Sequence, residues 1–389
     1  MKKTLTLIFS YYLIQGTLHN LGHPITPTYV NDLALNPRMF GFFFSFMSLG
    51  IVVGSLFWGV LGDRYKNRPL IVFGLLMYSL AQVGFGSSSN PVMMTAFRFL
   101  AGFSVSASIT LLLAYTIYHS TAETRVRNIA ITAALLALGT TFGYQIGGLL
   151  SVLFIREVFY VQAGLNALYA LYVLFTYQEI TGKTVNQAKL TDQFKTALTL
   201  DRSLLVFLIG LSLATIAATN LSKYLDVYII DAGYTPSELG TFVLVTGLVG
   251  IFTNFVIVPK VAKFKKDMVI MRYLQVASAV LIIITFQIEP LMLALYTIFL
   301  IYMVLKAMFE PLEKHYISLS ATPKTYASLM GVRQMFFSIG MVLGPLISGF
   351  LYEIEPLWVF YFSAGMFVFA FLLLTASDRV NLKMKASKL

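Results

Sequence analysis

Residues 139–148, GTTFGYQIGG, and residues 340–349, GMVLGPLISG, are the two stretches that decide the fold of this chain. The small residues of the first return 201 positions later in the second, and Asn20 returns as Asn220 at nearly the same offset. The matched pairs are Gly139 with Gly340, Gly143 with Gly344, Gly147 with Ser348, and Gly148 with Gly349. Matching halves of this size are typical of membrane carriers, whose substrate site lies between the halves near the middle of the bilayer.

The composition independently indicates a membrane protein. Hydrophobic residues make up 58% of the chain and charged residues 12%, and the mean hydropathy is +0.78. The charged fraction is about half that of an ordinary soluble domain. Most of the twelve uncharged runs reach the roughly 20 residues that cross a bilayer as a helix. These runs are 4–30, 39–62, 69–97, 99–122, 128–155, 158–178, 203–222, 239–259, 273–288, 290–305, 334–352 and 356–377.

We therefore predict an all-α polytopic membrane protein with twelve transmembrane helices in two pseudo-symmetric six-helix bundles. The first bundle is predicted over 1–177 and the second over 203–389, with a cytoplasmic linker at 178–202. The run at 4–30 is too long for the apolar core of a signal peptide and lacks a clear cleavage site after it, so we expect it to remain as the first span.

The positive charges predict the orientation. Twenty-three of the 28 lysines and arginines lie at the two termini and in five loops on one side of the twelve-span arrangement. These loops are 63–68, 119–127, 178–202, 260–272 and 313–333. By the positive-inside rule both termini are cytoplasmic, which suits a bacterial inner or plasma membrane protein. The net charge of +11 is explained by this topology and by attraction to anionic lipid, so we expect no nucleic-acid partner.

Patterns for catalysis and cofactor binding are not found in the sequence. The chain has no cysteine and four histidines that are not clustered with carboxylates at ligand spacing, so we expect neither disulfides nor a metal site. No phosphate-binding loop is present, which argues against ATP as the energy source. We expect no enzyme activity, no cofactor and a monomer in the bilayer.

The segment between the second and third spans carries the most specific motif. It consists of small, acidic and basic positions: Gly59, Gly62, Asp63, Arg64, Lys66 and Arg68. Small residues let helix ends approach, while an aspartate can meet a helix N-terminus or a basic partner. This segment resembles the cytoplasmic loop signature of the major facilitator superfamily, which implies the major facilitator fold and a gating role for the motif.

Two further spans extend the resemblance. Arg98 with Gly102 in the fourth span is similar to the fourth-helix motif of the superfamily, and Gly139 to Gly148 in the fifth is similar to the "antiporter" motif of its drug:proton antiporter branch. Glycines at this spacing also form flat faces for helix packing. The motif normally has proline where this chain has Tyr144, whereas the second half keeps the Gly-Pro form at Gly344-Pro345.

Polar residues within the apolar runs are the candidates for coupling and binding. In the first half His19 and His23 are spaced by four, which would stack them on one helical face, with Gln15 and Asn20 nearby. Histidine changes charge between about pH 5 and 8 and suits a proton-driven cycle. Packed core histidines and solvent-facing histidines are the alternatives.

In the second half Lys306 and Glu310 form an i,i+4 pair followed by Pro311. The resemblance makes Glu310 our first choice for a protonatable coupling residue, with a structural lock of the helix as the alternative. Further candidates for the substrate cavity are polar or aromatic residues on three spans: Arg98, Gln145, Asn220, Lys223, Tyr224 and Asp226.

The function predicted from these features is proton-coupled export of a hydrophobic or amphipathic small molecule. The aromatic content of 15% favours such a substrate, although aromatic residues also populate lipid-facing surfaces. The alternatives are a transporter of a metabolite such as a sugar or organic anion, and a lipid flippase or non-transporting sensor of the same fold.

Overall fold

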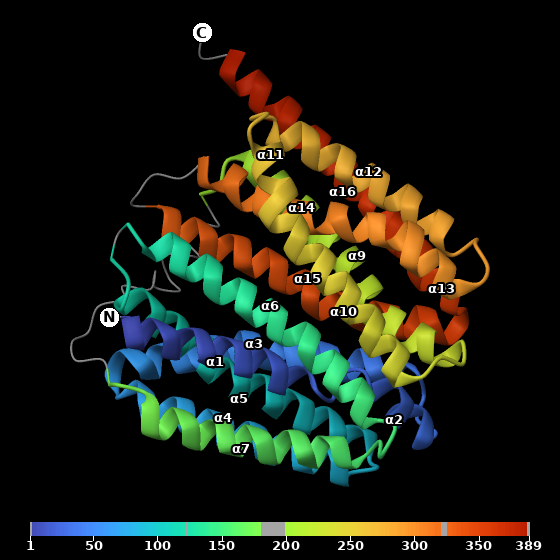
Figure 1. Ribbon diagram of the computed structural model, residues 1–389. Coiled ribbons are helices and arrows are strands. Elements are labelled where there is room, and N and C mark those ends of the chain that lie inside the picture. The colour runs from blue at the N-terminus through green and yellow to red at the C-terminus, as the bar shows by residue number, and fades with distance from the viewer. Residues whose placement is uncertain (1, 122, 180–198, 320–324, 387–389) are drawn as a thin grey trace. The chain divides into compact units, whose positions relative to one another are not determined.

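The structure is a computed structural model that describes residues 2–121, 123–179, 199–319 and 325–386 (Figure 1). This part of the chain is built of helices and contains no strand. The fold class predicted from the uncharged runs is therefore confirmed. Most of the predicted linker, 178–202, lies outside the described residues, and the division of the chain at 177 and 203 stays a prediction.

The helices of the first half follow the uncharged runs closely. They are α1 (Lys2–Asn20), α2 (Thr26–Asp32), α3 (Arg38–Arg64), α4 (Asn67–Ser87), α5 (Pro91–Tyr118), α6 (Arg125–Leu150) and α7 (Glu157–Thr176). The start of α5 shows how sequence sets such a boundary. Asn90 accepts hydrogen bonds from the backbone N–H groups of Val92 and Met93, at 2.9 and 3.2 Å, and Pro91 needs no partner for its nitrogen.

The helices of the second half are interrupted by two wide-turned π-helical segments, η1 and η2. In chain order they are α9 (Arg202–Asp231), α10 (Pro236–Phe252), η1 (Thr253–Ile257), α11 (Val258–Ala262), α12 (Asp267–Thr285), α13 (Leu291–Ala294), η2 (Leu295–Phe299), α14 (Leu300–Leu319), α15 (Tyr326–Ile354) and α16 (Pro356–Ala386).

Eleven helical segments in the described part of the chain are long and apolar enough to cross a membrane. The remaining predicted run, 4–30, contains α1, which is 19 residues long. Its lower hydropathy reflects Gln15, His19 and Asn20, and its helix ends at Asn20 because Gly22 and Pro24 follow.

One predicted loop is wrong in extent. The sequence places 313–333 in a cytoplasmic loop because charges interrupt the apolar runs there. In the structure α14 continues to Leu319 and α15 begins at Tyr326, so Glu313 and Arg333 are both helical. The charges do not end the helices because they compensate each other, as described below.

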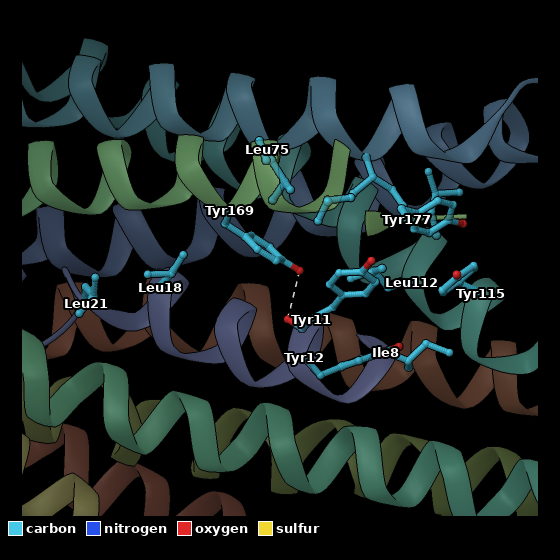
Figure 2. Close-up of a cluster of buried hydrophobic side chains, with 14 of the residues drawn as sticks. Ile8, Tyr11, Tyr12, Leu18, Leu21, Leu75, Leu112, Tyr115, Tyr169 and Tyr177 are labelled. Carbon is cyan, nitrogen blue, oxygen red and sulfur yellow. Dashed lines mark hydrogen bonds between the residues drawn. The ribbon is translucent and has the colours of Figure 1, made fainter. Parts of the chain in front are cut away.

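The core of the first half is rich in tyrosine (Figure 2). Buried side chains of α1, α4, α5 and α7 form one cluster, in which the hydroxyl of Tyr169 donates to the backbone oxygen of Tyr11 at 3.1 Å. Tyr115 stacks on Tyr177 with ring centroids 4.1 Å apart. The hydrogen bond of Tyr169 and the stacking of Tyr115 on Tyr177 depend on direction, so these rings fix neighbouring helices more specifically than aliphatic side chains would.

The chain divides into two compact units whose limits differ from the two sequence halves. The first unit contains residues 1–185 together with 226–248, and the second contains 186–225 and 249–389. The C-terminal end of α9 and most of α10 thus pack with helices of the first half. We call residues 226–248 the α9–α10 hairpin.

Candidate functional site

Three buried polar side chains of the first unit form a hydrogen-bonded row. They are His23, in the turn between α1 and α2, Tyr144 on α6, and Asp226 in the α9–α10 hairpin, with exposed fractions of 9%, 5% and 3%. His23 Nδ1 lies 3.3 Å from the Tyr144 hydroxyl oxygen, and that hydroxyl donates to Asp226 Oδ2 at 3.1 Å. A carboxylate only accepts. The Tyr144 hydroxyl must therefore donate its proton to Asp226. Its oxygen can then accept a hydrogen bond from His23 if Nδ1 of His23 carries a proton.

Aromatic rings enclose the row at His23. The His23 ring meets Phe44 and Tyr144 edge-on, with centroids 5.1 and 5.5 Å away. This packing orients the imidazole toward Tyr144. The arrangement can hold one proton more or fewer among a carboxylate, a phenol and an imidazole, and it joins helices from both sequence halves.

Small residues bring the hairpin against α6 beside this row. A Cβ atom on Gly148 would lie 3.1 Å from Ser237 Cα, and one on Gly240 would lie 2.6 Å from the backbone oxygen of Tyr144. Real Cβ atoms essentially never lie within 3.0 Å of such atoms. Gly148 and Gly240 therefore allow α6 and α10 to meet backbone to backbone. At the surface, Asn31 on α2 donates to Asp231 Oδ1 at 2.9 Å.

His19 lies in a different environment from His23, although the sequence spacing would stack them. The reason is that α1 ends at Asn20, so His23 is not on the same helix. His19 Nε2 contacts Asn166 Oδ1 at 3.2 Å, and Tyr78 donates to the His19 backbone oxygen at 3.4 Å. His19 is therefore part of a polar network inside the first bundle.

Arg98 is buried in the same bundle with 2% exposure. Its guanidinium donates to Thr26 Oγ1 at 3.1 Å and lies over the Phe85 ring, 3.7 Å from the centroid, with Phe159 at 5.7 Å. Hydrogen bonding and cation–π contact lower the cost of a buried cation. The side chain predicted to line a cavity thus joins α2, α4 and α7 to α5.

The repeated asparagines link equivalent helices in the two halves. Asn20 donates to the Gly16 oxygen on α1 and to Thr140 Oγ1 on α6, at 2.7 and 3.2 Å. With its amide nitrogen turned toward α15, Asn220 donates to the Gly344 oxygen at 2.6 Å. Each asparagine thus bonds the first long helix of its half to the helix that carries the repeated glycines.

The glycines of the packing motif lie at these same helix pairs. A Cβ on Gly143 would lie 2.9 Å from Asn20 Cβ, and one on Gly344 would lie 2.9 Å from the side-chain amide of Asn220. Gly147 faces the backbone of Leu21, while Gly340 faces the side chain of Thr215. The sequence repeat therefore corresponds to a repeated helix-packing contact.

Glu310 is paired with a residue other than the predicted one. Its carboxylate forms an exposed i,i+4 ion pair with Lys314 at 2.6 Å. Three residues further along α14, Glu313 is fully buried and forms a bidentate ion pair with Arg333 of α15, whose guanidinium also lies 4.6 Å from the Phe337 ring centre. Sequence reasoning missed this pair because it treated both residues as loop.

The remaining predicted cavity residues differ in burial. Gln15 and Tyr224 are buried, and the Tyr224 ring packs against Tyr352 with centroids 5.2 Å apart. Gln145 on α6, Lys223 on α9 and Lys306 on α14 are intermediate.

In the loop signature at the end of α3, the aspartate does not occupy the helix N-terminus that the sequence suggests for it. Asp63, Arg64, Lys66 and Arg68 are exposed, and Asp63 makes no hydrogen bond or ion pair within the described parts of the chain. The carboxylate at the N-terminus of α4 is Glu179, which accepts from the backbone N–H groups of Asn67 at 2.5 Å and Arg68 at 3.3 Å. Glu179 lies three residues after α7 and is far in sequence from α4, so no sequence pattern indicates this contact.

Comparisons with known proteins agree with this architecture. The family model described as "Major Facilitator Superfamily" matches residues 7–312 and 303–387. Among curated proteins, the chain is 23% identical to "Multidrug resistance protein 1" of Bacillus subtilis (strain 168), covering 92% of each chain. It is also 23% identical to "Quinolone resistance protein NorA" of Staphylococcus aureus (strain COL), covering 94% of each.

Solved structures share the fold at low identity. The nucleoside transporter NupG superposes with a TM-score of 0.80 at 14% identity, covering 96% of this chain and 99% of that one. The human organic anion transporter MFSD10 superposes with a TM-score of 0.66 at 16% identity, over 96% and 99% of the two chains.

Proposed function

Because the chain belongs to the Major Facilitator Superfamily, we propose that this membrane transporter exports amphipathic or hydrophobic small molecules in exchange for protons. It works by alternating access in a bacterial cell membrane, as a monomer with both termini in the cytoplasm. The exported substrate and the proton are its two mobile partners, and the lipid bilayer is its solvent.

The observation that carries proton coupling is the buried carboxylate of Asp226. It is 3% exposed and accepts a hydrogen bond from Tyr144, which in turn contacts His23. An ionisable side chain within membrane helices is costly and is by default a functional candidate. Proton binding removes the charge of Asp226, so a conformational change that alters its surroundings exchanges a proton with one side of the membrane.

Glu310 is the second coupling candidate. Its ion pair with Lys314 already stabilises the charged carboxylate. A group in this position gains less from a change of protonation than a buried one does. We therefore favour Asp226 over Glu310.

The proposed substrate class rests on composition and on the relatives. The chain contains 33 phenylalanines and 22 tyrosines, which suit apolar and ring-containing substrates. The two relatives described above are named for multidrug and quinolone resistance. The competing class, an anionic metabolite, requires an accessible cation. Arg98 is enclosed by Thr26, Phe85 and Phe159, which leaves the partly exposed Lys223 and Lys306 as the cations that such a substrate would use. The flippase and sensor alternatives have no comparable support.

The test uses purified protein reconstituted in liposomes with ethidium, a permanent cation that does not partition by pH on its own. A pH gradient without other energy should drive ethidium into the acidic compartment against its own gradient. Nigericin, which collapses the pH gradient, should abolish this accumulation. Protein-free liposomes provide the control.

A neutral dye, a quinolone, a nucleoside and an organic anion tested in parallel define the substrate class. Accumulation of the nucleoside or the anion alone would contradict export of amphipathic compounds. Asp226→Asn should retain downhill ethidium exchange and lose uphill accumulation. Uphill accumulation by Asp226→Asn at the wild-type rate would exclude Asp226 as the coupling residue.

A further inference from the structure

Polar contacts between the α9–α10 hairpin and the first-half helices include one at the surface and one in the interior. The hairpin backbone meets α6 through Gly148 and Gly240, where the atoms nearest to an added Cβ belong to the backbone. Glycine faces can separate and rejoin without repacking of interdigitated side chains. Polar links across such a face therefore decide how firmly it stays closed.

Two hydrogen bonds join the hairpin to the first-half helices near its beginning, one at Asp226 and one at Asp231. At the surface Asn31 donates to Asp231 at 2.9 Å, with both side chains exposed. At the buried end Tyr144 donates to Asp226 at 3.1 Å. The buried link is the stronger of the two, because a hydrogen bond to a charged acceptor gains strength where water is excluded.

Tyr144 also occupies the position at which the resembled antiporter motif has proline. Proline has no hydroxyl and no backbone donor. In this chain the substituted side chain reaches Asp226 on one side and His23 on the other. Its ring packs edge-on against His23, with centroids 5.5 Å apart.

We propose that the Tyr144 hydroxyl is the latch that holds the α9–α10 hairpin on α1 and α6, and that it positions Asp226 for proton exchange. The positioning part rests on the proposed function, whereas the latch does not. Tyr144 is a positioning residue that acts through the carboxylate. In the closed state its hydroxyl fixes the direction of the Asp226 oxygen. Separation of the hairpin from α6 breaks this bond and leaves the carboxylate to water.

The latch is tested by cross-linking, which requires no transport. The chain has no cysteine, so Asn31→Cys with Asp231→Cys provides the sole thiol pair, and a short bismaleimide reports closure in reconstituted protein. Tyr144→Phe in this background removes the hydroxyl and keeps the ring. We expect cross-linking to slow by roughly tenfold, the effect of losing one hydrogen bond to a charged acceptor.

Tyr169→Phe is the matched control. Tyr169 is equally buried, and its hydroxyl donates to the Tyr11 backbone oxygen at 3.1 Å within the first bundle. This variant loses one buried hydrogen bond without touching the hairpin, so its cross-linking rate should equal that of the parent. Equal rates for Tyr144→Phe and Tyr169→Phe would overturn the latch.

The positioning role is tested by transport in the chain without added cysteines. Tyr144→Phe should keep downhill ethidium exchange, lose most pH-driven accumulation and shift the pH profile of exchange, while Tyr169→Phe should match wild type in all three. Unchanged uphill accumulation by Tyr144→Phe would overturn the positioning role. If wild-type protein shows no pH-driven accumulation, the proposed function fails, and cross-linking alone still decides the latch.

Discussion

Replacing Gly139 by alanine should destabilise the protein, because α1 and α6 meet at this residue without room for a side chain. A Cβ there would lie 2.9 Å from the Thr17 nitrogen and 3.0 Å from Gly16 Cα, and closer still to the Leu13 backbone oxygen. These are backbone atoms of a packed helix, so relief requires the two helices to move apart. Overpacking of this kind costs about 1–3 kcal/mol.

Alanine brings an opposing gain in helix stability. In an open helical position, exchange of glycine for alanine stabilises by roughly 0.5–1 kcal/mol. Gly164 on α7 provides this reference, since a Cβ there would meet nothing within 4 Å. Gly164→Ala should therefore raise the free energy of unfolding, whereas Gly139→Ala should lower it by up to about 2.5 kcal/mol after the gain is subtracted.

Gly340, the repeat partner of Gly139, provides a second packed case. Its Cβ would lie 2.5 Å from Thr215 Cβ and 2.9 Å from the Ser212 oxygen. Because Thr215 Cβ is bonded directly to the backbone, relief again requires the two helices to move apart, so the loss should be close to that at Gly139. Reversible unfolding in mixed micelles measures all three variants. Gly139→Ala or Gly340→Ala protein as stable as Gly164→Ala protein would refute the reasoning.

Four further predictions follow from single contacts. Glu313→Gln should cost about 3–5 kcal/mol in the same unfolding assay, because it leaves the Arg333 guanidinium buried beside a neutral amide; a change below 1 kcal/mol would contradict this. Glu179→Ala should cost about 1 kcal/mol through the lost bonds to the N-terminus of α4, with Glu179→Gln in between, and equal stability of the three proteins would exclude this capping role. Glu310→Gln should keep pH-driven ethidium accumulation, since its exposed ion pair is worth less than about 1 kcal/mol, and loss of accumulation would restore it as the coupling residue. Asp63→Asn should leave the melting temperature unchanged but slow turnover in proteoliposomes if the loop signature gates the cytoplasmic side, and wild-type turnover would reject that role.

The sequence predicts the fold class because membrane helices require long uncharged, apolar segments, which can be recognised directly in the sequence. Uncharged runs of about 20 residues have few structural solutions in a bilayer. The repeat adds the packing logic, since Gly143 and Gly344 lie against Asn20 and Asn220 at equivalent helix pairs. Both features are local or periodic, so they can be read without knowledge of tertiary contacts.

Helix ends and partners were less accessible to sequence reasoning. Counting uncharged residues ends a span at its first charge, but Glu313 and Arg333 neutralise each other and allow α14 and α15 to continue. Conversely, the spacing of His19 and His23 implies a shared face only on an unbroken helix, and α1 ends at Asn20. Tertiary pairing decides the first case, and the local residues Gly22 and Pro24 decide the second.

The contact of Tyr144 with Asp226 is the feature least readable from the sequence. The two residues are distant along the chain and lie in different halves of the sequence. The one signal is the tyrosine at a position where the resembled motif has proline. A departure from a motif marks where to look without indicating the partner.

The limits of the compact units have a consequence for splitting the polypeptide. The hairpin, 226–248, belongs by its contacts to the first unit but is encoded within the second half. A fragment that stops after residue 185 would leave the α6 surface around Gly148 bare, and its complement would carry an undocked hairpin. Two such fragments produced together in one cell should associate through the hairpin. Because no covalent tether then joins them, their complementation should be sensitive to substitution of Gly240, which lies against α6.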